Sequence, residues 1–139
     1  MSNKKIEIYV ITPNATEQEK YKFQGHGDMV ILRCLTGDMG LLPGRVACSA
    51  ILGDGTLRIM EDEGPQRKIA IMGGVFHFEN DVLTVITQQA LLPGEIDITV
   101  TQAQAQEHET RLTQETNVTT KDKIRNQLRR FKVMLDVAG

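Results

Sequence analysis

The side chains best suited to metal or nucleophilic chemistry are few in this chain of 139 residues, and they are scattered. His26 lies in a glycine-rich turn, His77 on an expected strand and His108 on a polar helix, and none has a histidine or cysteine at metal-ligand spacing. The two cysteines, Cys34 and Cys48, lie in apolar segments typical of strands, where a free thiol usually packs as a small hydrophobic group. We therefore expect no metal site and no disulfide framework.

Sequence patterns of the common catalytic sites are missing as well. The chain contains no G-x-S-x-G nucleophile elbow, no H-E-x-x-H zinc helix and no G-x-x-x-x-G-K-[ST] phosphate loop. The pair Gly73-Gly74 is too short to cradle a phosphate, and we expect it to let a strand bend or approach its neighbour closely. The sequence thus predicts a protein without catalytic residues.

One charged feature near the C-terminus could bind a partner. Its basic side chains are Lys121, Lys123, Arg125, Arg129, Arg130 and Lys132. Few acidic residues lie among them, whereas the preceding segment carries several glutamates. Such a cluster is either a solvated helix face or a docking surface for an acidic partner.

Charge and hydropathy argue against two other kinds of partner. The formal net charge is -2, so no global positive field favours nucleic acid. No stretch approaches the roughly 18 consecutive apolar residues of a membrane span. The first residues lead into an alternating segment rather than an apolar signal sequence, so we expect a cytosolic protein that does not insert into membranes.

The chain has two parts that differ in composition. All four prolines, and every glycine except Gly139, lie at or before Pro93-Gly94, and the residues beyond are rich in Gln, Thr, Glu, Lys and Arg. This change predicts a compact domain at residues 1–92 and a helical tail at residues 93–139.

Short segments of alternating apolar residues predict that the first part is an antiparallel β-sandwich or flattened barrel. The expected strands lie at residues 6–10, 21–23, 30–34, 46–52, 57–59, 69–71, 76–78 and 82–86. Turn signals separate them at residues 12–14, 25–28, 37–44, 53–55, 63–65 and 80–81.

The second part is expected to be a hairpin of two helices joined near residues 116–118. Its second helix should begin near Thr119 or Thr120 and carry an apolar stripe on one face. The stripe consists of Ile124, Leu128, Phe131 and Leu135. Asp97 or Thr99 could cap the first helix, which has few apolar residues. We expect the hairpin to be marginally stable and mobile unless it docks on the sandwich or on another protein.

The expected turn at residues 37–44 combines three glycines and Pro43 with apolar side chains. Glycine and proline can hold Met39, Leu41 and Leu42 in one arrangement, which suits an apolar docking knob. Gly73-Gly74, a valine-rich run after Asn80-Asp81, and Ile96-Asp97 follow in order. This order resembles the epsilon subunit of F-type ATP synthases, whose pattern is G-x-x-G-x-L-P-G, G-G, N-x-V-T-V-L and then I-D. The resemblance covers nearly the whole chain.

The resemblance implies a non-catalytic subunit of the central stalk at the cytoplasmic face of the bacterial membrane. Such a subunit couples gamma to the membrane rotor ring during ATP synthesis driven by an ion gradient. The residues that would contact gamma and the ring are Asp38, Met39, Leu41, Leu42, Pro43 and Arg45, with Asp38 facing the ring. Where the family usually has P-G-H-x-P, this chain has Arg45 and Ala47 in place of the histidine and second proline.

For the tail, the resemblance implies a brake. In bacterial members the helices alternate between folding on the sandwich and extending along gamma into the alpha/beta catalytic head, where they suppress ATP hydrolysis. The basic residues that would meet an acidic loop on the head are Arg125, Arg129, Arg130 and Lys132.

Some family members bind ATP on the folded tail through I-D-x-x-R-A. This chain has Val100 and Thr101 at the arginine and alanine positions, so we assign no cofactor and interpret Asp97 as a helix cap. Two other classes of protein remain as alternatives to this interpretation. One is an adaptor of the same fold for another complex, and the other is a ligand-binding or catalytic barrel, which would need clustered histidines and carboxylates.

Overall fold

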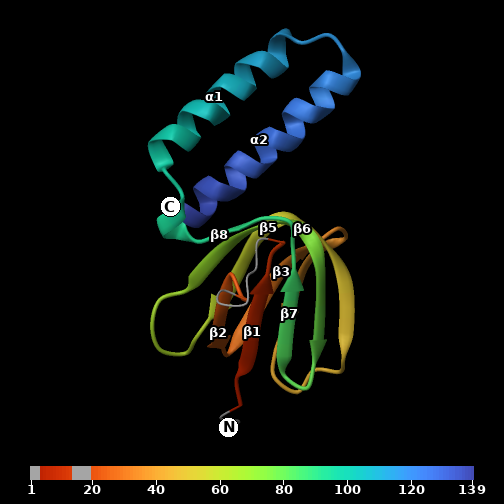
Figure 1. The fold of residues 1–139 in the computed structure, drawn as a ribbon, viewed down its shortest axis with the longest axis vertical. Coiled ribbons are helices and arrows are strands. Elements are labelled where there is room, and N and C mark those ends of the chain that lie inside the picture. The colour runs from red at the N-terminus through yellow and green to blue at the C-terminus, as the bar shows by residue number, and fades with distance from the viewer. Residues whose placement is uncertain (1–3, 14–19) are drawn as a thin grey trace.

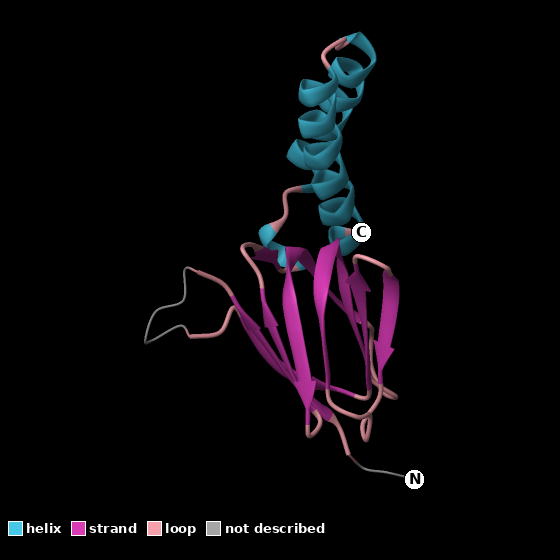
Figure 2. Cartoon of the chain, turned by 90° about the vertical axis from the view of Figure 1, so that its right-hand side faces the viewer, coloured by secondary structure: helices cyan, strands magenta, loops and turns pink. Residues whose placement is uncertain are grey.

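The computed structural model of the protein describes residues 4–13 and 20–139, so part of the expected turn at residues 12–14 lies outside it. The N-terminal part is a β-sandwich and the C-terminal part is a helical hairpin that projects from one end of it (Figures 1 and 2), which confirms the expected fold class. The strands are β1 (Ile6–Ile11), β2 (Phe23–Gly27), β3 (Met29–Cys34), β4 (Gly37–Leu41), β5 (Cys48–Met60), β6 (Arg67–Glu79), β7 (Val82–Ile86) and β8 (Ala90–Leu91). A 3-10 turn, η1 (Pro93–Glu95), leads to the helices α1 (Ile98–Gln114) and α2 (Val118–Ala138).

The strands follow the order β2-β1-β7-β6-β5-β3-β4, and β8 also pairs with β6. All pairs are antiparallel except β1 and β7, which run parallel. β5 and β6 pair along nearly their full length, and both curve over the end of the sandwich nearest the hairpin (Figure 1). Seventeen buried side chains from the strands fill the space between the faces, among them Ile6, Phe76 and Phe78.

Glycines permit the bend in β6. Gly74 has a φ of +113°, and a Cβ there would collide with the carbonyl oxygen of Ile86. Gly73 also has a positive φ, of +71°. The expectation that this pair lets a strand bend and approach its neighbour is therefore confirmed. Asn80 and Asp81, with φ values of 52° and 61°, form the expected tight turn between β6 and β7.

Three expected turns are wrong because long-range strand pairing overrides their glycines. Residues 53–55 lie inside β5. In the same way, the two strands expected at residues 69–71 and 76–78 are parts of one continuous strand, β6. Residues 25–27, including His26, lie on β2, where His26 pairs with Glu7 of β1. Most of the segment at 37–44 is strand β4, whose residues pair in register with β3.

The helical hairpin forms as its apolar stripe and the expected cap at Asp97 predict, and α2 begins at Val118, just before the expected start near Thr119 or Thr120. The Asp97 side chain accepts a hydrogen bond from Val100 N at 3.1 Å, and the Asn117 side chain caps α2 in the same way. Ile124, Leu128 and Phe131 are buried, and Leu135 packs beside them. His108 of α1 is half-buried, and its ring packs edge-on against Phe131, with 5.0 Å between centroids.

The hairpin is attached to the sandwich through α2. This helix lies against β5 and β6 near the end opposite the chain's N-terminus (Figure 1). Val137 is buried there in a small apolar cluster with Ala70 and Met72. Within the described residues, no helix is both long and apolar enough to cross a membrane.

Candidate partner-binding surfaces

The residues expected to form one docking knob do not lie together, because several of them belong to strand β4, where successive side chains point to opposite faces. Leu41 is fully buried in the sandwich core and offers no surface to a partner, so its assignment to an interface is corrected. Met39 is half-buried and packs against the same core. Asp38 lies near the other end of the strand, exposed, with its carboxylate 3.4 Å from Nε of Arg33. The expected knob is thus a strand whose successive side chains point alternately into the core and toward solvent.

The segment after β4 does present apolar side chains to solvent. Leu42 is 55% exposed and Val46 is 83% exposed, on either side of the turn at Pro43-Gly44. Gly44 N donates a hydrogen bond of 2.6 Å to the Asp81 carboxylate, which fastens this segment to the turn between β6 and β7. We name residues 42–46 the end loop.

Arg45 folds back along the end loop. Its Nη1 donates to the carbonyl oxygen of Gly40 at 3.3 Å, while the residue remains exposed. The guanidinium has further donors available beyond this hydrogen bond. Leu42, Pro43 and Arg45 therefore lie on one accessible segment, and Asp38 lies elsewhere.

A second apolar surface was missed by the sequence analysis. Ile51, Val75 and Ile86 are 59%, 45% and 53% exposed, and they form a row across β5, β6 and β7 because Val75 pairs with both of the others. A shallow groove of about 380 Å³ runs beside this outer row. The signal in the sequence was the set of apolar residues out of phase with the alternating core positions.

The basic cluster of α2 is partly occupied by contacts within the chain. Arg129 Nη2 and Arg130 Nε donate to the same oxygen, Oδ2 of Asp54, at 3.1 and 3.2 Å. The Asp54 side chain is only 7% exposed, whereas the two arginine side chains are 55% and 43% exposed. Two of the four cations expected to meet another protein thus bind the sandwich in this conformation.

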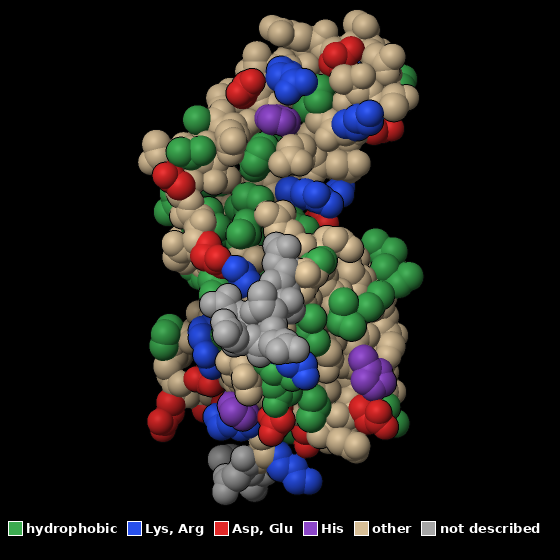
Figure 3. Space-filling model, in the orientation of Figure 1, with side chains coloured by type: hydrophobic (Ala, Val, Ile, Leu, Met, Phe, Trp, Pro, Cys, Tyr) green, Lys and Arg blue, Asp and Glu red, His purple; other side chains and the backbone are tan. Residues whose placement is uncertain are grey.

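The other cations of the expected set have partners on the hairpin itself. Arg125 lies 3.1 Å from Asp122 one turn earlier on α2, and Lys132 lies 3.6 Å from Glu109 of α1. Both pairs are exposed, so each is weak and can be exchanged for another partner at small cost. On the face seen in Figure 3, one group of basic side chains lies where the hairpin meets the sandwich, and others are spread over both parts.

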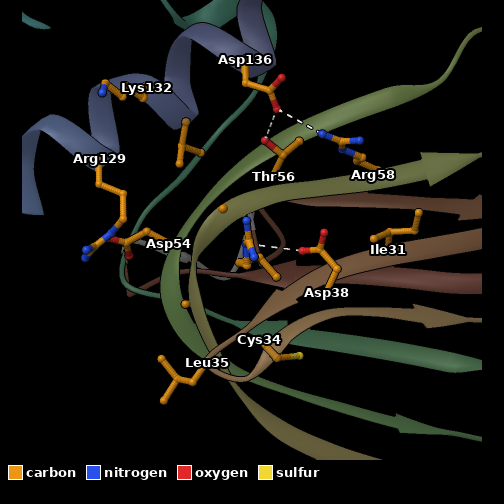
Figure 4. Close-up of a pocket in the computed structure, with 14 residues that line it drawn as sticks. Ile31, Cys34, Leu35, Asp38, Asp54, Thr56, Arg58, Arg129, Lys132 and Asp136 are labelled. Atoms are coloured by element: carbon orange, nitrogen blue, oxygen red, sulfur yellow. Dashed lines mark hydrogen bonds and ion pairs between the residues drawn. The ribbon is translucent and has the colours of Figure 1, made fainter.

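Farther along α2, a second set of ion pairs has the opposite charge arrangement, with the anion on the helix and the cations on the sandwich. The carboxylate of Asp136 accepts a hydrogen bond from Thr56 Oγ1 at 2.6 Å and lies 3.7 Å from Arg58 and 3.8 Å from Lys68. Figure 4 shows Asp136 and Arg129 descending from the helix toward β5. Between them is an open hollow of about 520 Å³, lined on the sandwich side by Arg33 and Cys34 among others. Burial raises the pKa of the Cys34 thiol, so this cysteine is a structural hydrophobic group.

An ion pair also fixes the start of the tail. Lys22 Nζ lies 2.6 Å from Oε2 of Glu95, and Oε1 of Glu95 accepts a hydrogen bond from Leu92 N at 2.9 Å. The hydrogen bond from Lys22, followed by that from Leu92, lowers the pKa of the Glu95 carboxyl. Beyond η1, Val100 is 51% exposed and Thr101 is buried on the inner side of α1.

Comparisons with known sequences place this chain beside one protein family. Residues 5–93 match the family model described as ATP synthase, Delta/Epsilon chain, beta-sandwich domain. An ATP synthase epsilon chain of Brevibacillus brevis is 31% identical over 110 residues, which cover 79% of this chain and 80% of that one. Another, from Synechococcus sp. strain WH7803, is 43% identical over 75 residues, or 54% of each chain. The family model ends before α1.

Two solved structures contain chains of similar fold. A chain in the Euglena gracilis mitochondrial ATP synthase, OSCP/F1/c-ring, superposes with a TM-score of 0.73 at 21% identity, covering 99% of this chain and 86% of that chain. A chain in the Tetrahymena thermophila mitochondrial ATP synthase central stalk and c-ring gives 0.58 at 10% identity and full coverage of both. At these identities the likeness concerns the fold, and it extends over the hairpin as well as the sandwich.

Proposed function

The chain belongs to the delta/epsilon chain family of ATP synthases, and from this premise we propose that it is the epsilon subunit of the central stalk. In this role it links gamma to the membrane rotor ring and takes no part in the chemistry of ATP synthesis. The match of the family model across residues 5–93 is the observation that carries the proposal. Such a subunit is peripheral and works at the cytoplasmic face of a bacterial membrane.

We assign contact with gamma and the ring to the end loop, with the outer row as a second apolar face. Leu42 and Val46 are exposed without packing partners that bury them, and Arg45 adds a cation beside them. Apolar side chains next to a charged group are typical of a surface that is covered in a complex. Of the residues that the resemblance assigns to the contact with gamma and the ring, Leu42, Pro43 and Arg45 keep this role. Asp38 becomes a separate candidate for contact with the ring.

The tail is proposed to restrain ATP hydrolysis. Its attachment to the sandwich is a small apolar cluster plus ion pairs, which is a weak joint for a segment of this length. A released α2 would expose Arg125, Arg129, Arg130 and Lys132 together to an acidic surface of the alpha/beta head. The family model does not cover these residues, so this role is tested separately from the first.

Co-purification with gamma tests the proposal. We expect the tagged wild-type chain to retain gamma from the same organism, and Leu42→Asp to retain much less, because a carboxylate would be buried without a partner. Leu35→Asp is the matched control, since Leu35 is a 69% exposed leucine at the other end of the β3–β4 hairpin. Wild-type protein that fails to retain gamma would contradict the function, and equal retention by Leu42→Asp would remove the end loop from the interface.

A further inference from the structure

The joint between α2 and the sandwich has an apolar part that is too small to fix the hairpin by itself. Val137, Ala70 and Met72 are its fully buried members, and only partly buried side chains surround them. The main sandwich core is separate from this patch, and the hairpin's own cluster around Phe131 is linked to it through partly buried Met134. The polar contacts on either side of this patch therefore contribute much of what holds the hairpin in place.

Asp54 is the most buried charge at the joint. It lies in the bend of β5 between Gly53 and Gly55, and its carboxylate is 7% exposed. Arg129 and Arg130 reach it from α2, 75 and 76 residues away in the sequence. A carboxylate with so little access to water is costly unless cations compensate it, so the folded-down hairpin and this carboxylate depend on each other.

Asp136 makes the second contact with the opposite charge arrangement. Here the anion is on the helix, and the cations Arg58 and Lys68 are on the sandwich. Asp136 lies six residues beyond Arg130, about 9 Å along a helix. Two contacts of opposite polarity at this spacing fix both the position and the rotation of α2, because sliding or turning the helix brings like charges together.

We propose that Asp54 and Asp136 form an ionic latch that holds the hairpin on the sandwich, and that Asp54 competes with the acidic partner surface for Arg129 and Arg130. The latch itself follows from the contacts within this chain. The competition rests on the proposed function of the tail. Arg129 and Arg130 each donate to Oδ2 of Asp54, which compensates much of their charge and holds them against β5, so an acidic partner must compete with Asp54 for these two cations. The folded-down state thus engages, through Asp54, the two arginines that the extended state needs.

Hydrogen exchange of the isolated full-length chain tests the latch. In Asp54→Asn, amides of residues 118–138 should exchange about tenfold faster than in the wild type, while β1 and β7 stay protected. Added salt should narrow this difference, since screening weakens the wild-type contact. Asp62→Asn is the control, because Asp62 is exposed in the loop between β5 and β6. Equal exchange in Asp54→Asn and the control would overturn the latch.

Removing the cations should have a larger effect than removing the anion. Arg129→Gln with Arg130→Gln leaves the Asp54 carboxylate buried without compensation, so opening the joint becomes favourable because it returns that carboxylate to water. We expect faster exchange in this double variant than in Asp54→Asn, and partial recovery when all three substitutions are combined. Arg125→Gln removes one cation from a residue whose ion pair, among the described residues, is with Asp122 of its own helix, and it should match the wild type. If the effects of Asp54→Asn and of the double arginine variant on exchange simply add in the triple variant, direct pairing between Asp54 and these arginines is overturned.

The competition predicts opposite effects on the assembled enzyme. Asp54→Asn frees the arginines, so it should deepen the inhibition of ATP hydrolysis. Arg129→Gln with Arg130→Gln opens the same joint but removes the charges for the partner, so it should relieve inhibition. Effects of the same sign would overturn the competition. If removal of the whole tail leaves hydrolysis unchanged, the proposed brake fails, and the exchange measurements still decide the latch.

Discussion

Replacing Phe131 with alanine should melt the hairpin without unfolding the sandwich. Phe131 is 7% exposed and is the largest side chain in the cluster that joins α1 to α2. Truncating a buried phenylalanine costs about 3 to 5 kcal/mol. The edge contact with His108 contributes about 0.5 to 1.5 kcal/mol of additional attraction, and it is lost too. The neighbours Leu112 and Leu135 are only partly buried and can collapse inward, so we expect a loss near the lower limit, about 3 kcal/mol.

This loss corresponds to an increase of about 150-fold in the equilibrium constant for opening the hairpin. The main sandwich core contains none of the residues around Phe131, so its own free energy of unfolding should change little. Two-dimensional amide NMR spectra of the full-length chain can follow both parts at once. In Phe131→Ala, resonances of residues 98–138 should lose dispersion and protection from exchange, while those of β1 and β7 keep theirs.

Val118→Ala is the control for Phe131→Ala. Val118 lies on the same helix and is 72% exposed, so shortening it should change hairpin stability by less than about 0.5 kcal/mol. Cooperative loss of the sandwich together with the hairpin in Phe131→Ala would refute the separation of the two parts. Unchanged protection of the hairpin would refute the importance of this cluster.

Three further predictions concern the sandwich and its connection to the tail. Leu41→Asp should unfold the sandwich in circular dichroism, whereas Leu42→Asp should leave its melting temperature nearly unchanged, because only Leu41 is buried. Gly74→Ala should lower the urea midpoint strongly, and Gly94→Ala, with open space around it, should not. The pKa of Glu95 in the folded chain lies below its ordinary 4.5, so its contribution to stability is present above pH 4.5 and is lost below it. Glu95→Gln should therefore lose less stability than the wild type on acidification, measured by urea unfolding between about pH 5 and pH 3.

The alternating core positions could be predicted from the sequence because they depend on local periodicity. Ile6, Ile8 and Val10 are all fully buried as their spacing indicates. The apolar stripe of α2 was predictable for the same reason. In both cases one face of a single element determines burial, so no knowledge of distant residues was required.

The glycine-rich segments were not predictable because their role depends on distant residues. Gly55 lies inside β5, where the side chain of Arg33 packs over the space that a Cβ would occupy. Gly40 belongs to β4, which is a strand because it pairs with β3. Glycine is common in turns and also wherever another group approaches the backbone closely, and the local sequence does not separate the two cases.

The contacts of the candidate site also divide into features that the local sequence predicts and features that depend on distant residues. The sequence identified Arg129 and Arg130 as available cations, yet Asp54, their partner, lay in a segment interpreted as a turn. The pairing depends on how α2 docks across β5, and side-chain composition alone does not specify that docking. The outer row was missed because its members are adjacent only through the register of three strands.

ATP hydrolysis by a reconstituted ATP synthase tests the central claim most directly. The enzyme would be assembled with the full-length chain or with a chain ending at Gly94, and gamma would be quantified in both preparations. We predict that both forms assemble with gamma and that the truncated form hydrolyses ATP severalfold faster, because the sandwich makes the stalk contacts and the tail restrains hydrolysis. Failure of the full-length chain to assemble would contradict its role in the stalk, and equal hydrolysis by the two assembled enzymes would contradict the role of the tail.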